Sequence, residues 1–376
     1  MDIDPTGHYA IGDWGFSVVD RDGALIMSGP GIPEGFEPRL ERTGTAGLRI
    51  ATGFLSGSQI EFQVDDAGRV TGGLAGGAIP VERLDSPPQA VPGGGLRAPD
   101  FPENIERDRL FGERWRGVLP GGVVSADPYP IHSLVQWLMR RNEFIFHGSN
   151  RPEIEEFAPR RESMEIGNQG RHGNLGAVYG THDGLWAMFF AVVDRSSIRG
   201  SIRNGVGMYE SATGERIDLY RFSVDARVLH SRPFTSGMLY ILPRDRFERI
   251  AVYPGGPPSN EWACYEPVRP VAKLAMEPED FPFLDRVGGH DDGELVRLSE
   301  LNDEVYACLA ASAPIDGGFR LVFDRLDPAT RDEWIALGRR FFPDVQRRLV
   351  DEVTVEMTGP PAFVHTMERR LAERDA

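Results

Sequence analysis

Cysteine is scarce in this chain, since Cys264 and Cys308 are the only two among 376 residues. Two cysteines cannot build a disulfide framework or a four-cysteine zinc site, and such usage suits a reducing compartment. Long apolar runs are also missing, because the longest, LWAMFFAVV at 185–193, is far too short to cross a bilayer. The segment MDIDPTGHYAIG lacks a basic region followed by an apolar stretch, so no secretory signal is expected. We therefore expect a cytoplasmic protein with no membrane partner.

Positive charge is in deficit, with 41 Lys and Arg against 57 Asp and Glu and a net charge of -16. This balance argues against broad binding to a phosphate backbone, although a local basic groove remains compatible with it. The chain also has no Walker A motif, no G-x-G-x-x-G after a strand, no HExxH and no CxxC. We therefore expect neither a Rossmann-type nucleotide domain nor a bound metal.

The composition is that of a folded protein, with 40% hydrophobic and 26% charged residues. Its length exceeds what one compact core usually holds, so we expect two or three domains. Residues 1–85 are predicted to form an all-β accessory domain, because FSVVDRDGALIM and IEFQVDDAGRVTGGL are pairs of short apolar runs joined by turn residues. This pattern resembles the small antiparallel barrels that are appended to bacterial serine hydrolases. Residues 86–100, rich in Pro and Gly, are predicted to be a linker.

The remainder divides into a mixed α/β region, 101–290, and a region predicted to be helical, 291–376. IHSLVQWLMRR at 131–141 has apolar residues at helical spacing, and a strand carrying His147 follows it. Further strands are predicted at AVYGT (177–181), GMLYILP (237–243) and VAKLAM (271–276), with a buried helix starting at Asp183. Near the C-terminal end, Asp327 is followed by Pro328, which predicts a helix start, and FVHTMERRLAERDA predicts a charged final helix.

Three short stretches of the mixed region stand out by their order. The first is FIFHGSN at 144–150, in which an apolar run ends at His147 and is followed by Gly148 and Ser149. The second is GNQGRHGNLGAVYGTHD at 167–183, in which glycines lead to Tyr179. The third is SNEWACYEPVRPVAKLAM at 259–276, which opens with Glu261.

Together these stretches resemble the H-Y-E branch of the ADP-ribosyltransferase superfamily, which includes the diphtheria-toxin-like enzymes and the poly-ADP-ribose polymerases. The resemblance covers roughly residues 130–280, and the flanking regions share none of it. It implies an α+β fold in which split, mostly antiparallel sheets surround a cleft for NAD, here between an N-terminal barrel-like domain and a helical C-terminal segment. NAD would be a substrate and not a resident cofactor.

The resemblance also implies roles for the motif residues, and their chemistry suits those roles. His147 would orient NAD through a ribose hydroxyl, and the bare backbone of Gly148 would hold the nicotinamide amide. Ser149 would offer a hydroxyl, and Tyr179 a flat face for the nicotinamide ring. Glu261 would stabilise the positive charge that builds on the ribose, and would orient or deprotonate the incoming nucleophile.

Other residues near the motifs are weaker candidates. Tyr209 or Tyr220 could supply a second aromatic face, and neither can be assigned from the sequence. The resemblance makes the glycine-rich stretch a loop over the bound dinucleotide, and nearby arginines could meet its pyrophosphate. His172 and His182 are predicted to be bystanders. The loop glycines and arginines in question are Gly167, Gly170, Gly173, Gly176, Arg160, Arg161 and Arg171.

The expected activity is transfer of ADP-ribose from NAD to an unidentified acceptor, which could be a protein, a nucleic acid or a small molecule. Arginine is disfavoured as the acceptor, because Ser259 occupies the position where arginine-specific relatives carry a second acidic residue. Two alternatives share the same residues: a NAD glycohydrolase, and a catalytically silent module that binds NAD or ADP-ribose. An RNA 2'-phosphotransferase is less compatible, because that group has a histidine where this chain has Tyr179.

Overall fold

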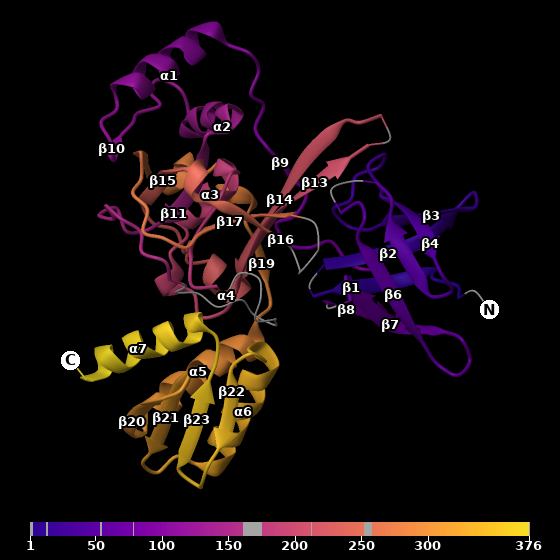
Figure 1. Ribbon diagram of the computed structural model, residues 1–376, viewed down its shortest axis with the longest axis vertical. Coiled ribbons are helices and arrows are strands. Elements are labelled where there is room, and N and C mark those ends of the chain that lie inside the picture. Colours follow the sequence, from indigo (N-terminus) through magenta and orange to yellow (C-terminus); the bar gives the residue numbers. More distant parts are fainter. Residues whose placement is uncertain are drawn as a thin grey trace.

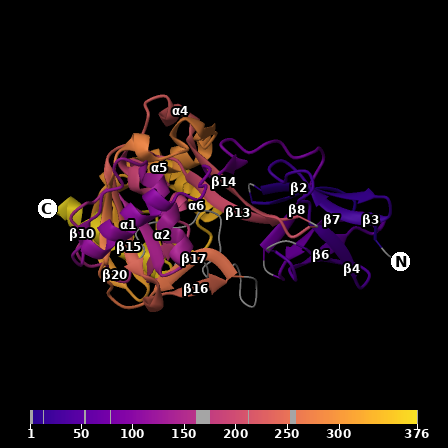
Figure 2. The same cartoon turned by 90° about the horizontal axis from the view of Figure 1, so that it is seen from above.

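The computed structural model describes residues 3–12, 14–52, 55–77, 79–160, 175–211, 213–251 and 258–375. The chain forms three regions, each built around buried apolar side chains of its own. Figure 1 shows the N-terminal barrel to one side of the central region, and the C-terminal region below it. The view from above agrees, with strands β13 (Ile202–Glu210) and β14 (Arg216–Asp225) extending from the central region toward the barrel (Figure 2).

The N-terminal region is a closed barrel of eight antiparallel strands, in which β1 pairs with both β2 and β8. Its interior is filled by large side chains such as Tyr9, Phe16 and Phe62, which are almost wholly buried. The predicted all-β barrel is therefore confirmed. The strands are β1 (Gly7–Ile11), β2 (Trp14–Arg21), β3 (Ala24–Ser28), β4 (Arg39–Thr43), β5 (Gly47–Ile50), β6 (Gln59–Val64), β7 (Val70–Ala75) and β8 (Ile79–Leu84).

The Pro/Gly segment 86–100 is tied to the central region and is not a loose tether. Within it, β9 (Leu96–Arg97) pairs with β14. The carbonyl of Gly93 accepts a hydrogen bond from the Phe222 backbone N–H at 3.0 Å. A Cβ on Gly93 would lie 1.9 Å from the Phe222 carbonyl oxygen, so only glycine permits this approach.

The central region contains a seven-stranded sheet, ordered β10-β18-β15-β11-β12-β17-β16, and a four-stranded sheet, β13-β14-β19 with β9. All pairings are antiparallel except those of β10 with β18 and of β14 with β19. Its helices are α1 (Ile105–Gly117), α2 (Ile131–Arg141), α3 (Gly184–Val192) and α4 (Ala226–Leu229). The remaining strands are β10 (Gly122–Val123), β11 (Phe144–Ser149), β12 (Val178–Thr181), β15 (Gly237–Pro243), β16 (Glu248–Ala251), β17 (Pro258–Cys264), β18 (Ala272–Met276) and β19 (Gly288–His290).

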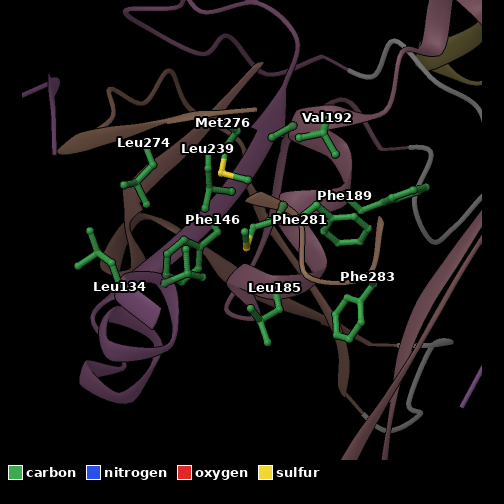
Figure 3. Packing of buried hydrophobic residues seen from close by; sticks show 14 of the residues in the cluster. Leu134, Phe146, Leu185, Phe189, Val192, Leu239, Leu274, Met276, Phe281 and Phe283 are labelled. Atoms are coloured by element: carbon green, nitrogen blue, oxygen red, sulfur yellow. The ribbon is translucent and has the colours of Figure 1, made fainter. Parts of the chain in front are cut away.

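Helix α3 lies inside the central core, as its nearly all-apolar sequence predicts. It begins after Asp183, whose side chain accepts a hydrogen bond from the Trp186 backbone N–H. Figure 3 shows Leu185 and Phe189 of this helix among the core side chains, together with Phe146 from β11. The predicted elements around the motifs therefore match the structure: α2, α3, β11, β12, β15 and β18.

The prediction of a helical C-terminal region is wrong in part. Helices α5 (Gly293–Ala307), α6 (Pro328–Phe341) and α7 (Pro361–Asp375) are present, and Asp327 caps α6 as expected. They accompany an antiparallel sheet ordered β20-β21-β23-β22. The missed signal is the Asp316-Gly317 turn, which joins two short apolar runs so that Ile315 pairs with Gly318. The strands are β20 (Leu309–Ile315), β21 (Gly318–Phe323), β22 (Gln346–Leu349) and β23 (Thr354–Thr358).

A bilayer span requires a helix that is both long and apolar. None of the helices in the described part of the chain combines this length and this apolar character.

Candidate functional site

The three motifs lie on three adjacent strands of the seven-stranded sheet: β11, β12 and β17. Phe146 on β11 is opposite Thr181 on β12, and Thr181 is in turn opposite Glu261 on β17. Residues far apart in the sequence therefore form one row across the sheet. The motif order of the sequence becomes the strand order in space.

Tyr179 and Glu261 share one face of this sheet. Directly opposed residues of antiparallel strands project to the same side, and so do residues two apart along a strand. Because Glu261 is opposite Thr181, Tyr179 projects to the side of Glu261. Both side chains are half-buried. This is the face covered by the central core and α3, not the face that carries Trp262 and Cys264.

His147 is held between β11 and β12. Its ring nitrogen Nδ1 lies 2.7 Å from the carbonyl oxygen of Tyr179. A carbonyl can only accept, so Nδ1 carries the proton of this bond and donates it to Tyr179. The ring also meets Phe157 edge-on at 4.7 Å between centroids. Phe157 belongs to the apolar cluster on the sheet face away from Glu261, so the His147 ring lies on that face. His147 therefore contacts the backbone of Tyr179 and not its side chain, which projects to the other face.

Gly148 is required by packing as well as by any ligand. A Cβ at this position would lie 2.2 Å from the Ala187 carbonyl oxygen and 2.5 Å from the Ala191 nitrogen, both in α3. The glycine thus lets β11 lie directly against the helix. Its backbone is paired with Leu239 of β15, within a ladder of six register positions. By contrast, the ladder between β11 and β12 has the single position Phe146↔Thr181, so these two strands separate beside Gly148.

The hydroxyls of Ser149 and Tyr179 take part in local hydrogen bonds. Ser149 Oγ accepts from the Arg151 backbone N–H at 3.2 Å. Tyr179 Oη accepts from the Leu175 backbone N–H at 2.8 Å, which ties the tyrosine to the end of the glycine-rich stretch. Both side chains are half-buried, so each retains an accessible part.

Glu261 sits on a strand that is fixed from both sides. Its backbone N–H donates to Ser259 Oγ at 3.1 Å, and Ser259 is buried. Its neighbour Asn260 donates from Nδ2 to the Val206 carbonyl oxygen of β13 at 3.0 Å. The Oε2 atom of Glu261 is shielded from solvent. The carboxylate is therefore positioned by the strand and partly removed from water, which strengthens its action on a nearby positive charge.

Sequence reasoning missed an electrostatic feature at this end of the sheet. His182 accepts a hydrogen bond from Trp262 Nε1 at 3.4 Å, and burial lowers its pKa to about 4, with the charges of Arg249 and Arg244 adding to the effect. The ring is therefore neutral near pH 7. No local pattern in the sequence indicates this feature, because Arg244 and Arg249 lie 62 and 67 residues after His182 along the chain.

Asp183 and Tyr220 form a buried pair at the start of α3. The Tyr220 hydroxyl donates to Asp183 Oδ2 at 2.9 Å, and both residues are at most 4% exposed. Burial raises the pKa of Asp183 to about 6. Tyr220 therefore cannot offer a ring face to nicotinamide, as one sequence alternative suggested. Tyr209 lies on β13 and lines a cavity of about 370 Å³ together with barrel residues such as Trp14 and Phe36.

Most of the glycine-rich loop lies outside the described residues. This holds for Gly167, Gly170, Gly173, Arg161, Arg171 and His172. Two members of the stretch are described: Arg160, whose backbone N–H donates to the Ala177 carbonyl at 3.3 Å, and Gly176, which approaches Pro361 at the start of α7. Their proposed roles toward the pyrophosphate stay predictions.

A buried cluster of Ser201, His290 and Asp292 has the residue types of a hydrolase triad but not its geometry. Ser201 Oγ and Asp292 Oδ2 both lie 2.9 Å from the same ring nitrogen, Nε2 of His290, and Nδ1 meets Ser223 at 2.9 Å. A catalytic triad requires the carboxylate and the hydroxyl on opposite ring nitrogens. All four side chains are nearly inaccessible. This cluster therefore joins β13, β14 and β19 structurally.

Comparisons with known proteins add no family assignment: no family model, no curated protein and no solved structure matches the chain.

Proposed function

We propose that this chain is a NAD-dependent mono-ADP-ribosyltransferase. The observation that carries the proposal is the placement of His147, Tyr179 and Glu261 on three adjacent strands of one sheet. The resemblance to the H-Y-E enzymes uses these same three residues in this order. We propose, together with the activity, the fold that this resemblance implies, in which split antiparallel sheets surround a cleft for NAD.

The proposed reaction breaks the bond between nicotinamide and the ribose C1′ of NAD. The bonding electrons leave with nicotinamide, and positive charge builds on the ribose as in glycoside hydrolysis. The acceptor then supplies an electron pair to C1′ and passes its proton to the Glu261 carboxylate or to water. Glu261 is suited to stabilise the cationic ribose, because its carboxylate is fixed on β17 and partly shielded from water.

The separation of β11 and β12 suggests how one dinucleotide could meet all three residues. Beside Gly148 the two strands no longer pair, while the His147 ring lies between them. A ligand that enters at this point would have Nε2 of His147 on one side, and the Tyr179 ring and the Glu261 carboxylate on the other. Gly148 and Ser149, at the end of β11, are proposed to contact the nicotinamide end.

The identity of the acceptor stays open, with one restriction. The position two residues before Glu261 holds Ser259, whose hydroxyl is engaged by the Glu261 backbone. A second carboxylate that could attract a guanidinium is absent there. Arginine is therefore disfavoured as the acceptor.

The decisive experiment is to incubate the full chain with NAD and measure released nicotinamide, beside Glu261→Gln and a matched Glu279→Gln control. Glu279 is an exposed glutamate that follows β18. Removal of the Glu261 charge should reduce release by about a hundredfold or more, whereas the control should match the native chain. If all three proteins release nicotinamide equally, or if none does, the transferase proposal fails. In the latter case, a calorimetric NAD titration would identify a silent binding module.

A second readout separates transfer from hydrolysis. With NAD labelled in its adenylate half, incorporation of label into a macromolecule indicates a transferase. Loss of NAD with label recovered only as free ADP-ribose indicates a glycohydrolase that uses water as the acceptor.

A further inference from the structure

The cavity beside Tyr209 lies where the barrel meets the β13–β14 hairpin and the segment that joins them. On the barrel side it is lined by apolar side chains that include Trp14, Ile32 and Phe36, and on the hairpin side by Val206 and Tyr209, among others. Figures 1 and 2 both show the two long strands of the hairpin extending to the barrel at this place. Its volume of about 370 Å³ is within the range of sites that hold small organic ligands.

Glycines shape this space. At Gly31, Gly95 and Gly205, which all line the cavity, an added Cβ would meet nothing within 4 Å. Gly31 and Gly95 have positive φ angles of +88° and +70°, so the backbone itself favours glycine there, whereas Gly205 has no such angle. A Cβ on Gly207 would lie 3.0 Å from Cε2 of Tyr209, so this glycine lets the tyrosine ring lie close to the strand. The room beside Gly205 is therefore a feature that a larger residue could remove.

The charged residues of the lining are engaged within the protein. Among the described residues, Glu210 and Arg221 are the two charged ones that line the cavity. Glu210 pairs with Arg216 at 2.7 Å, and Arg221 also has a partner. A charged ligand would therefore leave water without a free ion to meet it, and such a transfer is costly. The lining thus favours an uncharged ligand.

The Tyr209 hydroxyl is the polar group best suited to orient such a ligand. Two other hydroxyls belong to lining residues and are already used: Thr52 Oγ1 accepts from the Arg39 backbone N–H at 3.0 Å, and Tyr220 donates to Asp183. Within the described part of the chain, no hydrogen bond engages the Tyr209 hydroxyl. Burial raises the pKa of Tyr209, so this hydroxyl keeps its proton and can donate it to an acceptor.

We propose that this cavity is a binding site for a small, uncharged aromatic compound that has one carbonyl group. The ring system would contact Trp14 and Phe36, and the carbonyl oxygen would accept a hydrogen bond from the Tyr209 hydroxyl. The ring of Trp14 stacks on the buried Phe16 with centroids 5.1 Å apart, which holds this wall of the cavity in place. The inference is independent of NAD chemistry, because it depends only on the shape and lining of the cavity.

The test uses a flat, uncharged fluorescent ketone, 6-propionyl-2-(dimethylamino)naphthalene, titrated into the full chain. It should bind saturably with one site per chain. Three compounds of one shape then compete with it: 2-acetylnaphthalene has the carbonyl, 2-isopropenylnaphthalene has a CH2 group in place of the oxygen, and 2-naphthoate has a negative charge. The ketone should displace the probe about fivefold more tightly than the alkene, and about tenfold or more tightly than the carboxylate.

Variants test the hydroxyl and the space separately. Tyr209→Phe should weaken 2-acetylnaphthalene about fivefold, to the affinity of the alkene, and leave the alkene unchanged. Gly205→Leu should weaken the fluorescent ketone and all three competitors about tenfold or more, because it fills the cavity. The matched control is Gly117→Leu at the end of α1, where an added Cβ also meets nothing. This control should bind as the native chain does.

Thermal melting of each variant verifies folding, and if Gly205→Leu does not fold, the smaller Gly205→Ala and Gly205→Val should show a graded loss. Binding without saturation, or equal affinity in native, Gly205 and Gly117 variants, would overturn the site. Equal weakening of ketone and alkene by Tyr209→Phe would overturn the carbonyl part of the assignment. Tighter binding of the carboxylate than of the ketone would overturn the uncharged class.

Discussion

His147 Nδ1 donates a hydrogen bond to the carbonyl oxygen of Tyr179 across 2.7 Å, and so links two of the three motifs through the backbone. The bond fixes the ring tautomer and its orientation. It also joins β11 to β12 next to the point where their ladder ends. Nδ1 is therefore a structural nitrogen, and Nε2 is the nitrogen that the proposed function assigns to NAD.

The two nitrogens of His147 can be tested apart. Asparagine places an amide near Nδ1, and glutamine places one near Nε2. We expect His147→Asn to retain the bond to Tyr179, with unfolding free energy within about 0.5 kcal/mol of native, but to weaken NAD binding about tenfold, or about 1.4 kcal/mol. His147→Gln should lose about 1 kcal/mol of stability and retain more of the affinity. Urea unfolding and calorimetric NAD titration measure the two effects. Native NAD affinity in His147→Asn would refute the assignment of Nε2.

Gly148→Ala is expected to destabilise the protein by about 3 kcal/mol, because the added methyl group would collide with the α3 backbone. Overpacking against backbone atoms cannot be relieved by a rotamer change. The control is Gly117→Ala, whose new Cβ meets nothing within 4 Å and which should be neutral or slightly stabilising. Denaturant unfolding compares the three proteins. A Gly148→Ala variant as stable as the native chain would show that β11 and α3 do not pack as closely as described.

Local patterns in the sequence predicted the elements that carry the site. The helical spacing of 131–141 and the cap at Asp183 correspond to α2 and α3, because both depend on residues a few positions apart. The adjacency of β11, β12 and β17 was not predicted, since it depends on pairings such as Phe146↔Thr181 and Thr181↔Glu261, whose partners are 35 and 80 residues apart in the sequence. The role of Gly148 in packing was missed for the same reason: its partners Ala187 and Ala191 are about forty residues away.

The stability of the protein should depend on pH through two neighbouring residues that act in opposite directions. Folded Asp183, with its pKa raised to about 6 by burial, keeps a proton that the unfolded chain loses near its ordinary value of 3.8. Its stabilising contribution, at most about 3 kcal/mol, is therefore present below pH 4 and is lost as pH rises through 6. Folded His182, with its pKa lowered to about 4, resists a proton that the unfolded chain gains below 6.5. Its effect makes stability rise with pH over the same range.

Because the two effects offset each other, the wild-type profile alone cannot separate them. Urea unfolding at pH 4, 5, 6 and 7 should be measured for the native chain, Asp183→Asn and His182→Gln. Relative to native, Asp183→Asn should gain stability as pH rises, and His182→Gln should gain stability as pH falls. Profiles that stay parallel to the native one would show that neither residue titrates differently on folding.

We expect Asp292 to stabilise the fold strongly and not to activate Ser201 as a nucleophile. Burial opposes its charge, but hydrogen bonds from His290 and Ser201 prevail and hold its pKa below its ordinary value, and Arg203 pairs with it at 2.8 Å. Its contribution is thus present above pH 4 and is lost as pH falls further. Asp292→Asn should lower the free energy of unfolding by about 3 kcal/mol at pH 7, since it leaves a buried network incomplete, whereas the exposed Asp285→Asn should cause no measurable change.

A fluorophosphonate probe should leave Ser201 unlabelled, because Asp292 and Ser201 share one nitrogen of His290 and the nucleophile has no separate base. Labelling of Ser201 that is abolished in Asp292→Asn would instead reveal a hydrolase triad, formed by rearrangement of this cluster.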